Sequence, residues 1–210
     1  MKQSDQKSTL RKRLGIMGGT FDPIHYGHLV AAETARYKFD LERVIFIPSG
    51  APPHKTKRRI SLPEFRYQMV SRAIADNDFF EVSRIEIERT GLTYTVDTLR
   101  LLKEEYPNYE LYFITGADAF REIFTWRSPD EIIELTQFIG ASRPGFDALD
   151  FLSQLQQQSP RFYQRMHFME VPALAISSTD IRLRVKAGQS IRYLLPEPVR
   201  LFIQKNGIYK

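Results

Sequence analysis

Residues 18–28 read Gly-Gly-Thr-Phe-Asp-Pro-Ile-His-Tyr-Gly-His, and they stand where a strand pattern changes into a helix pattern. Residues 14–17 before them form a short apolar run typical of a buried strand, and residues 29–35 after them favour a helix. Gly18 and Gly19 allow a tight turn and let the backbone come close to a ligand. A helix that begins here offers unpaired N–H groups and a partial positive charge, both of which suit phosphate. The stretch therefore predicts a nucleotide-phosphate site without a P-loop lysine.

Two histidines of this stretch, His25 and His28, are three residues apart and so share one helix face. Such a pair can also be half of a metal site, or simply a partly buried pair of rings. The chain has four histidines and no cysteine, which makes zinc held by the protein the least favoured of these readings. We therefore predict no metal ligated by the protein.

The net charge of +5 is concentrated at the start of the chain. Residues 1–13 carry a net charge of +4, and we expect them to form a basic, disordered tail before a single domain over residues 14–210. Because the rest of the chain is close to neutral, the composition does not favour a nucleic-acid partner.

The sequence contains no cysteine, no apolar run of membrane-spanning length and no signal-peptide pattern. The absence of cysteine excludes disulfides and is compatible with a reducing compartment. We therefore expect a cytoplasmic protein without a membrane partner.

Apolar, β-rich runs alternate with helical patterns along the chain. The runs that predict strands are residues 14–17, 44–48, 79–82, 110–114, 137–141 and 167–171. The patterns that predict helices are residues 27–39, 62–75, 95–105, 129–135, 147–157, 178–187 and 196–205. The alternation predicts an α/β fold, a Rossmann-like, doubly wound, mostly parallel sheet with helices on both faces. Ligands bind such sheets beyond the carboxyl ends of the strands, at the point where the strand order reverses.

A second stretch, residues 176–182, reads Ile-Ser-Ser-Thr-Asp-Ile-Arg and precedes an apolar helical pattern. Ser177 and Ser178 are suited to cap that helix, and Arg182 falls one turn inside it. A helix N-terminus with hydroxyls and a guanidinium is a second phosphate clamp. Taken alone, the same pattern also describes an ordinary capped helix with a surface arginine.

The two stretches together resemble the nucleotidylyltransferase superfamily and, within it, the bacterial nicotinate-nucleotide adenylyltransferases. The resemblance runs from about residue 14 to the C-terminus. Four further segments match: Pro-Ser-Gly-Ala-Pro-Pro-His-Lys at 48–55, Gly-Leu-Thr-Tyr-Thr-Val-Asp-Thr-Leu at 91–99, Gly-Ala-Asp at 116–118 followed by Trp126, and Ser-Arg-Pro-Gly at 142–145.

The resemblance implies adenylyl transfer from ATP to nicotinate mononucleotide, giving deamido-NAD and pyrophosphate in a step of NAD biosynthesis. The attacking phosphate is already an anion, so positioning and charge neutralisation would do most of the work. The implied cofactor is Mg²⁺, held mainly by the ATP phosphates and water. A homodimer is compatible with the family.

The resemblance also implies which residues contact ATP. The implied catalytic residues, which contact the phosphates, are His25, His28 and Arg182. The implied ATP-binding residues are Gly18, Gly19, Thr20, Phe21, Gly27, Ser177, Ser178 and Asp118. Among these, Thr20 and Phe21 would lend backbone N–H groups, Gly27 would leave room for adenine, and Asp118 would bond ribose hydroxyls. Asp118 could instead cap the next helix.

The implied acceptor-binding residues lie in three segments. They are Lys55 and His54 in the basic loop 49–59, Thr93 and Tyr94 before a helix, and Trp126. Backbone N–H donors of Thr93 and Tyr94 would accept a nicotinate carboxylate and reject the NH₂ of an amide. Trp126 would stack on the pyridine ring, although a half-buried packing role is the alternative. The loop could equally be a solvated basic turn.

The sequence is also compatible with three other functions. The acceptor could be nicotinamide mononucleotide, phosphopantetheine or glycerol phosphate. Class I aminoacyl-tRNA synthetases use a related His-x-Gly-His turn, but this chain is short for them and shows no anticodon module. A non-enzymatic RNA-binding module would depend on residues 1–13 and 49–59, and would show salt-dependent binding without turnover.

Overall fold

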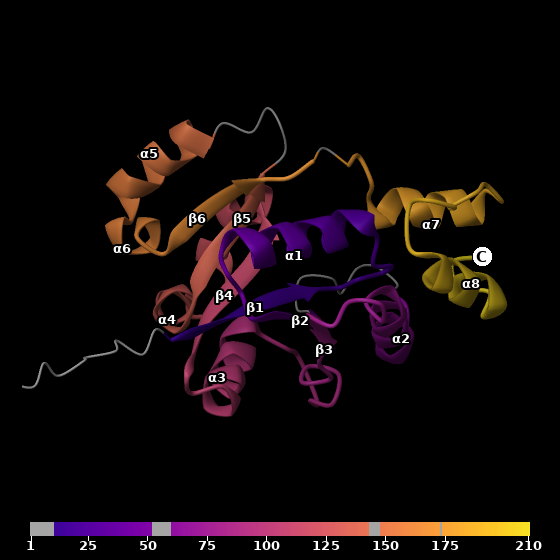
Figure 1. Cartoon of the computed structure of the whole chain (residues 1–210), viewed down its shortest axis with the longest axis horizontal. Helices are drawn as coiled ribbons and strands as arrows, with labels where there is room; N and C mark the ends of the chain where they lie inside the picture. Colours follow the sequence, from indigo (N-terminus) through magenta and orange to yellow (C-terminus); the bar gives the residue numbers. More distant parts are fainter. Residues whose placement is uncertain (1–10, 52–59, 143–147, 173) are drawn as a thin grey trace, which may run out of the picture.

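The computed structural model describes residues 11–51, 60–142, 148–172 and 174–210 (Figure 1). Six parallel strands form one sheet in the order β3-β2-β1-β4-β5-β6. The strands are β1 (Lys12–Gly19), β2 (Arg43–Pro48), β3 (Phe80–Val82), β4 (Tyr109–Gly116), β5 (Gln137–Ser142) and β6 (Met166–Glu170). This order reverses between β1 and β4, as in a doubly wound sheet, so the predicted Rossmann-like α/β fold is confirmed.

The first strand starts earlier than residue 14. Lys12 and Arg13 pair with Tyr109 and Glu110 of β4, so they belong to the sheet and not to the expected tail. Lys12 also forms a 2.9 Å ion pair with Glu42. Residues 1–10, the rest of that expected tail, lie outside the described residues.

Seven predicted helices are present with ends that differ by at most two residues. They are α1 (Tyr26–Lys38), α2 (Pro63–Ala73), α3 (Thr95–Glu105), α4 (Pro129–Leu135), α5 (Ala148–Gln158), α7 (Ser178–Lys186) and α8 (Glu197–Lys205). The sequence patterns missed the 3₁₀ helix η2 (Ala117–Thr125) and the one-turn helix α6 (Pro160–Tyr163). Both are too short or too tightly wound to show a 3.6-residue period.

The sheet separates two hydrophobic cores because side chains alternate along each strand. Val44 and Phe46 of β2 face the core formed with α1, α2, α7 and α8. Ile45 and Ile47 face the opposite core, formed with α3, η2 and α4 together with Leu155 and Phe162. Figure 1 shows α1 and α3 on opposite sides of the strands.

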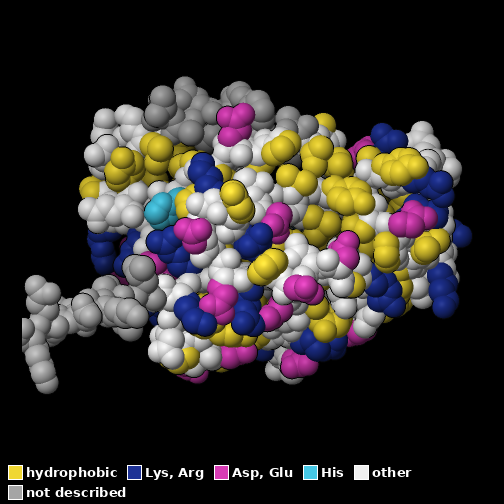
Figure 2. All heavy atoms as spheres, in the orientation of Figure 1, with side chains coloured by type: hydrophobic (Ala, Val, Ile, Leu, Met, Phe, Trp, Pro, Cys, Tyr) yellow, Lys and Arg dark blue, Asp and Glu magenta, His cyan; other side chains and the backbone are white. Residues whose placement is uncertain are grey.

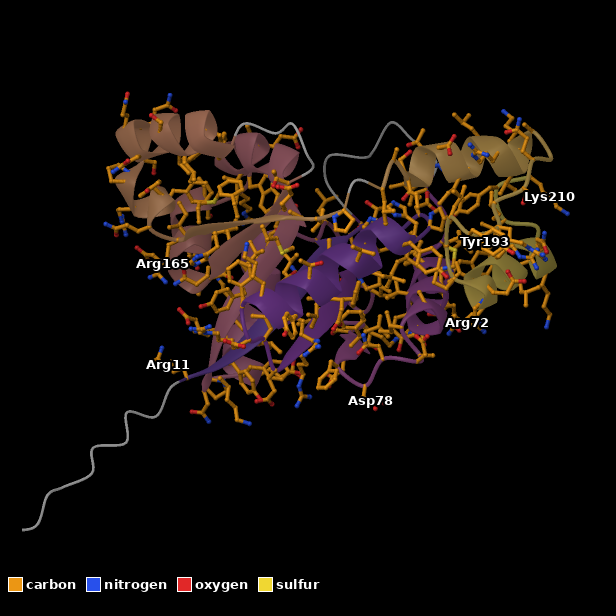
Figure 3. The ribbon with its side chains drawn as sticks, turned by 45° about the horizontal axis from the view of Figure 1, so that its top comes forward. Arg11, Arg72, Asp78, Arg165, Tyr193 and Lys210 are labelled. Atoms are coloured by element: carbon orange, nitrogen blue, oxygen red, sulfur yellow. The ribbon has the colours of Figure 1, made fainter. Side chains whose placement is uncertain are left out.

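The C-terminal part of the chain packs back onto α2. The Arg72 guanidinium lies 4.4 Å from the centre of the Phe202 ring of α8, and Phe65 meets the same ring edge-on at 6.0 Å. In Figure 3 the labelled Arg72 and the C-terminal Lys210 both lie at this end of the molecule. The hydroxyl of Tyr209 also donates to Asp22 in the turn after β1, so this segment lies close to the carboxyl end of the first strand, where the predicted site lies.

The surface seen in Figure 2 carries basic and acidic side chains side by side, with no broad basic field on that face. Many of them are paired, for example Arg43 with Glu81 at 2.5 Å and Arg84 with Glu64 at 2.8 Å. In the described parts of the chain, no helix combines the length and apolar character needed to cross a membrane.

Candidate functional site

Three cavities lie beyond the carboxyl ends of β1 and β4, and we name each after one lining residue. The Trp126 cavity, of about 280 Å³, is lined by residues that include Gly18, Gly19, Thr20, Ser49, Glu86, Thr93, Tyr94, Thr95, Thr115, Glu122, Trp126 and Arg127. The His25 cavity, of about 340 Å³, is lined by residues that include Gly18, His25, Gly27, His28, Thr115, Gly116, Ser177 and Ser178. The Arg182 cavity, of about 270 Å³, is lined by Thr20, Phe21, Asp22, His28, Ile60, Ser178, Thr179 and Arg182.

The cavities adjoin because they share walls. Gly18 and Thr115 line both the Trp126 cavity and the His25 cavity. Thr20 lines both the Trp126 cavity and the Arg182 cavity, while His28 and Ser178 line both the His25 cavity and the Arg182 cavity. An extended ligand can therefore cross the ends of β1 and β4 and contact all three.

The glycine turn after β1 presents backbone to these cavities, while the side chain after it turns inward. Phe21 has a positive φ of 49° and is 3% exposed, and its ring contacts Phe46 at 5.9 Å and His28 at 5.2 Å. A Cβ on Gly19 would lie 3.0 Å from the Phe21 ring, so a larger residue would crowd it. With its side chain buried, Phe21 can offer a ligand only its backbone, and the predicted contact through its N–H stays a prediction.

The two histidines of the first stretch form one stacked unit at the start of α1. Their ring centres are 3.8 Å apart with planes 27° apart, and the backbone N–H of His25 donates to Nδ1 of His28 at 3.2 Å. Burial, and to a lesser degree the charge of His25, hold the pKa of His28 well below its usual range. Because Nδ1 accepts a hydrogen bond, the ring proton of neutral His28 sits on Nε2, which leaves that N–H available to a ligand.

Gly27 makes space for this histidine pair. A Cβ at Gly27 would lie 3.0 Å from Cε1 and Nδ1 of His25 and 3.9 Å from the carbonyl oxygen of Ile176. The structure therefore gives Gly27 a role in seating the His25 ring, in addition to the predicted role of leaving room for adenine. Gly27 also lines the His25 cavity.

The second stretch is bonded directly to the first. The hydroxyl of Ser177 accepts from the backbone N–H of Asp180 at 3.1 Å, which is the predicted N-cap of α7. The hydroxyl of Ser178 donates to the carbonyl of Pro23 at 2.8 Å. The guanidinium of Arg182 donates to the carbonyl of Asp22 at 2.5 Å and to Oγ1 of Thr179 at 2.8 Å.

These bonds change what the serines can offer to a ligand. Ser178 spends its hydroxyl proton on Pro23, whereas Ser177 only accepts, so its O–H can still donate. The ligand-facing donors are therefore this hydroxyl, the backbone N–H groups at the start of α7 and the remaining donors of Arg182. The helix N-termini of α1 and α7 both open onto the His25 and Arg182 cavities. Together they form an anion-binding region without a carboxylate cluster.

The expectation that the backbone N–H of Thr93 binds the nicotinate carboxylate is wrong. This N–H donates to the carbonyl of Ala51 at 3.1 Å, so it is not available to a nicotinate carboxylate. The hydroxyl of Thr93 is buried and has no hydrogen-bond partner in the described structure. Tyr94 is the N-cap of α3, and its carbonyl accepts from the N–H groups of Asp97 and Thr98. The N–H groups of Thr95 and Val96 are the donors left at that helix end.

A second hydroxyl in the same cavity was missed by the sequence analysis. Oγ of Ser49 is also buried without a hydrogen-bond partner in the described structure, and it lines the Trp126 cavity together with Thr93. Buried polar atoms in folded proteins are normally hydrogen-bonded. Two such hydroxyls beside one cavity therefore indicate that a polar ligand completes them.

Trp126 forms one wall of this cavity. It is half-buried and meets Phe113 edge-on, with ring centres 5.8 Å apart. Next to it, the guanidinium of Arg127 lies 4.7 Å from the centre of the Tyr94 ring. Arg127 was not identified from the sequence, although its position directly after Trp126 was a usable signal.

Arg66, which anchors the glycine turn, was also missed by the sequence analysis. It is 1% exposed, and its guanidinium donates to three backbone carbonyls, those of Thr20 at 2.9 Å, Ser61 at 3.0 Å and Gly50 at 3.2 Å. Burial lowers its pKa, and the nearby carboxylates of Asp22 and Glu86 oppose that shift. Arg66 thus ties the glycine turn to the chain on both sides of residues 52–59.

The side chains of three predicted site residues are not described by the structure. His54 and Lys55 lie in 52–59, outside the described residues. Asp118 lies in η2, directly after β4, but its side chain is not among those described. The remaining thirteen predicted residues all line at least one of the three cavities.

Comparison with known proteins identifies close relatives. The model of the family described as Cytidylyltransferase-like matches residues 16–184. A protein of Desulfitobacterium hafniense (strain Y51) named "Probable nicotinate-nucleotide adenylyltransferase" is 66% identical over 199 residues, which cover 95% of this chain and 96% of that relative. A protein of the same name from Moorella thermoacetica is 54% identical over 203 residues, covering 94% and 92%.

Solved structures share the fold. The Plasmodium falciparum nicotinic acid mononucleotide adenylyltransferase complexed with NaAD superposes with a TM-score of 0.76 and 22% identity. The match covers 94% of this chain and 97% of that one. The same enzyme complexed with APC gives a TM-score of 0.73. At this identity the likeness establishes the common fold.

Proposed function

The chain belongs to the cytidylyltransferase-like family and, within it, to the nicotinate-nucleotide adenylyltransferases, and we infer from this that it transfers the adenylyl group of ATP to nicotinate mononucleotide. The products are deamido-NAD and pyrophosphate, which places the reaction in NAD biosynthesis. One observation in the structure carries the assignment. A continuous set of cavities joins an anion-binding region, built from two helix N-termini and a histidine pair, to a cavity walled by an aromatic ring.

The phosphate chemistry requires charge neutralisation and alignment from the chain. The 5′-phosphate of the acceptor attacks the α-phosphorus of ATP, the bond to the β-phosphate breaks, and pyrophosphate leaves. Because the attacking oxygen is already anionic, no general base is required. His25 and the Nε2 proton of His28 donate to the phosphates at the start of α1, while Arg182 and the start of α7 hold the leaving pyrophosphate.

The acceptor ring lies in the Trp126 cavity in this proposal. Its pyridine ring stacks on Trp126, and its carboxylate receives the N–H groups at the start of α3 and the hydroxyl of Thr93. A carboxylate satisfies these donors, whereas the NH₂ of an amide would face other donors. We also propose that Asp118 contacts ribose hydroxyls and that Lys55 and His54 contact substrate phosphate.

The Mg²⁺ proposed for this reaction fits the donors that are present. Within the described residues, no group of three or more His, Asp or Glu side chains is arranged to hold a metal. The nearby carboxylate of Asp22 is buried and accepts from the hydroxyl of Tyr209 at 2.7 Å. The ion would therefore take its ligands from ATP phosphates and water, and would neutralise charge on the triphosphate.

Pyrophosphate release tests the function directly. The protein, ATP and Mg²⁺ are combined with nicotinate mononucleotide, nicotinamide mononucleotide or phosphopantetheine in separate reactions. We expect turnover mainly with the nicotinate substrate, and a loss of about 10²-fold in kcat/KM for His25→Ala. His167→Asn is the matched control, because its ring lies against Phe39 and Tyr112, away from the three cavities.

Each outcome bears on a different part of the proposal. Turnover mainly with the amide would keep the fold and the phosphate chemistry but overturn the account of the α3 N-terminus. Turnover only with phosphopantetheine, or with none of the three, would overturn the proposed reaction. An equal loss in His25→Ala and His167→Asn would remove His25 from the phosphate site.

A further inference from the structure

The Trp126 cavity has more acidic than basic side chains among its described lining residues. Among the described lining residues, Glu86 and Glu122 are acidic and Arg127 is the single basic one. Glu86 is 9% exposed, accepts from the hydroxyl of Thr98 at 2.8 Å and lies in the field of Arg66. Glu122 is exposed and opens onto the same cavity. A carboxylate brought in by a ligand would therefore meet two like charges.

Arg127 is held at this cavity without a carboxylate partner. Its guanidinium stacks over Tyr94 at 4.7 Å, and within the described structure it forms no ion pair. The neighbouring arginines differ in this respect. Arg89 pairs with Asp97 at 3.3 Å, and Arg100 pairs with Asp97 at 2.9 Å. The Tyr94 ring thus orients a cation whose charge is not already matched.

We propose that Arg127 is a specificity-determining residue, whose guanidinium attracts the carboxylate of the nicotinate ring and so favours it over the neutral amide. This inference rests on the proposed function and deepens it. The ring of Tyr94 packs against the guanidinium, and Tyr94 is also the N-cap of α3, the helix whose N–H groups receive the carboxylate. The cation and the helix end therefore border the same cavity.

The two contributions differ in their physical character. Hydrogen bonds from the start of α3 act at contact distance and depend on geometry. The attraction of Arg127 acts over a longer range, is partly screened by solvent because the side chain is exposed, and weakens with salt. It also offsets the repulsion that Glu86 and Glu122 exert on a carboxylate but not on an amide. Arg127 should therefore change the ratio between the two substrates rather than the rate of the chemical step.

The test compares kcat/KM for nicotinate mononucleotide and for nicotinamide mononucleotide in the wild type and in Arg127→Gln and Arg127→Lys. For Arg127→Gln we expect kcat/KM with the nicotinate substrate to fall about fivefold to tenfold through KM, while kcat/KM with the amide substrate is unchanged. Arg127→Lys keeps the charge but loses the planar stacking on Tyr94, so kcat/KM with the nicotinate substrate should fall less than in Arg127→Gln. Arg161→Gln is the matched control, since it removes an equal charge from an exposed site whose partner is Glu134.

A parallel fall with both substrates, or no change in either, would overturn the inference. So would a loss in Arg127→Lys as large as in Arg127→Gln, because charge would then not be the cause. A second measurement needs no variant: raising salt from about 50 to 500 mM should lower the nicotinate-to-amide ratio of kcat/KM in the wild type, and a constant ratio would count against the charge of Arg127. If the wild type does not turn over nicotinate mononucleotide at all, it is the proposed function that fails.

Discussion

The hydroxyl of Tyr209 donates a 2.7 Å hydrogen bond to Oδ1 of Asp22, joining the next-to-last residue of the chain to the turn that follows β1. Asp22 is 4% exposed, and its own carbonyl accepts from Arg182. Burial, together with the charge of Asp22, raises the pKa of Tyr209 far above its usual range, so the hydroxyl keeps its proton. The end of the chain is thus linked through Asp22 to the guanidinium that we place at the pyrophosphate.

Removing that hydroxyl should weaken both the fold and the phosphate site. Tyr209→Phe leaves a buried carboxylate oxygen without this donor, at a cost of about 1–3 kcal/mol of unfolding free energy. We expect KM for ATP to rise several-fold, because Asp22 no longer holds Arg182 as firmly. Denaturant unfolding and initial rates measure the two effects, with the exposed Tyr37→Phe as control. Unchanged stability in Tyr209→Phe would show that the bond contributes nothing to the fold.

Arg66 is predicted to be far more important for stability than any surface arginine. Arg66→Met would leave the carbonyls of Thr20, Gly50 and Ser61 without this donor. It would also remove the Arg66 charge from beside Asp22 and Glu86. Losing one partner of a buried charged group costs about 3–5 kcal/mol, which corresponds to a fall in Tm of roughly 10 °C in a chain of this size.

Arg66→Lys should recover only part of this loss, because an ammonium cannot reach three carbonyls in the fork geometry of a guanidinium. Thermal unfolding of both variants measures the difference, and Arg192→Met removes an exposed arginine for comparison. Equal Tm values for Arg66→Met and Arg192→Met would contradict the anchoring role of Arg66.

The pH dependence of stability should carry a contribution from His28. Its pKa in the folded protein lies well below the value of about 6.5 expected in the unfolded chain. Between these two values the unfolded state binds one more proton than the folded state. The stabilisation is therefore complete above about pH 6.5 and is lost as the pH falls toward the folded-state pKa, by up to about 1.4 kcal/mol per pH unit.

His28→Asn isolates this effect, because the amide oxygen can still accept from the backbone of His25 but does not titrate. We expect the unfolding free energy of the variant to fall less between pH 7.5 and 5 than that of the wild type. His167 also has a pKa lowered by burial, but it is present in both proteins and cancels in the difference. Parallel pH profiles would mean that His28 is not the titrating group.

The unpartnered hydroxyl of Thr93 predicts opposite effects on the free and the ligand-bound protein. Thr93→Val removes a buried hydroxyl that has no hydrogen-bond partner in the described structure, so the free protein should be as stable or up to about 1 kcal/mol more stable. KM for nicotinate mononucleotide should rise several-fold, since the hydroxyl is a proposed donor to the carboxylate. Unfolding in the absence of ligand and initial rates measure both, and a loss of stability would indicate that the hydroxyl is bonded in the free protein.

Several features of the fold could be predicted from the sequence because their signals are local. The apolar runs predicted all six strands, and the glycine turn and the capping serines marked the two helix N-termini that open onto the cavities. The early start of β1 and the 3₁₀ helix η2 escaped prediction. Lys12 and Arg13 are strand residues because β4 pairs with them, which no property of those two residues indicates.

The sequence by itself determined the class of the fold, the family and the position of the phosphate site at the end of the first strand. These could be predicted because the alternation of strand and helix patterns, the turn residues and the helix caps each depend on residues that are close together in the chain. Only the tertiary structure decided which donors the site has left. The N–H of Thr93 donates to the carbonyl of Ala51, and the hydroxyl of Ser178 donates to the carbonyl of Pro23. The guanidinium of Arg127 lies over the ring of Tyr94. Each of these contacts joins segments far apart in the chain, so it exists only once the sheet has brought them together.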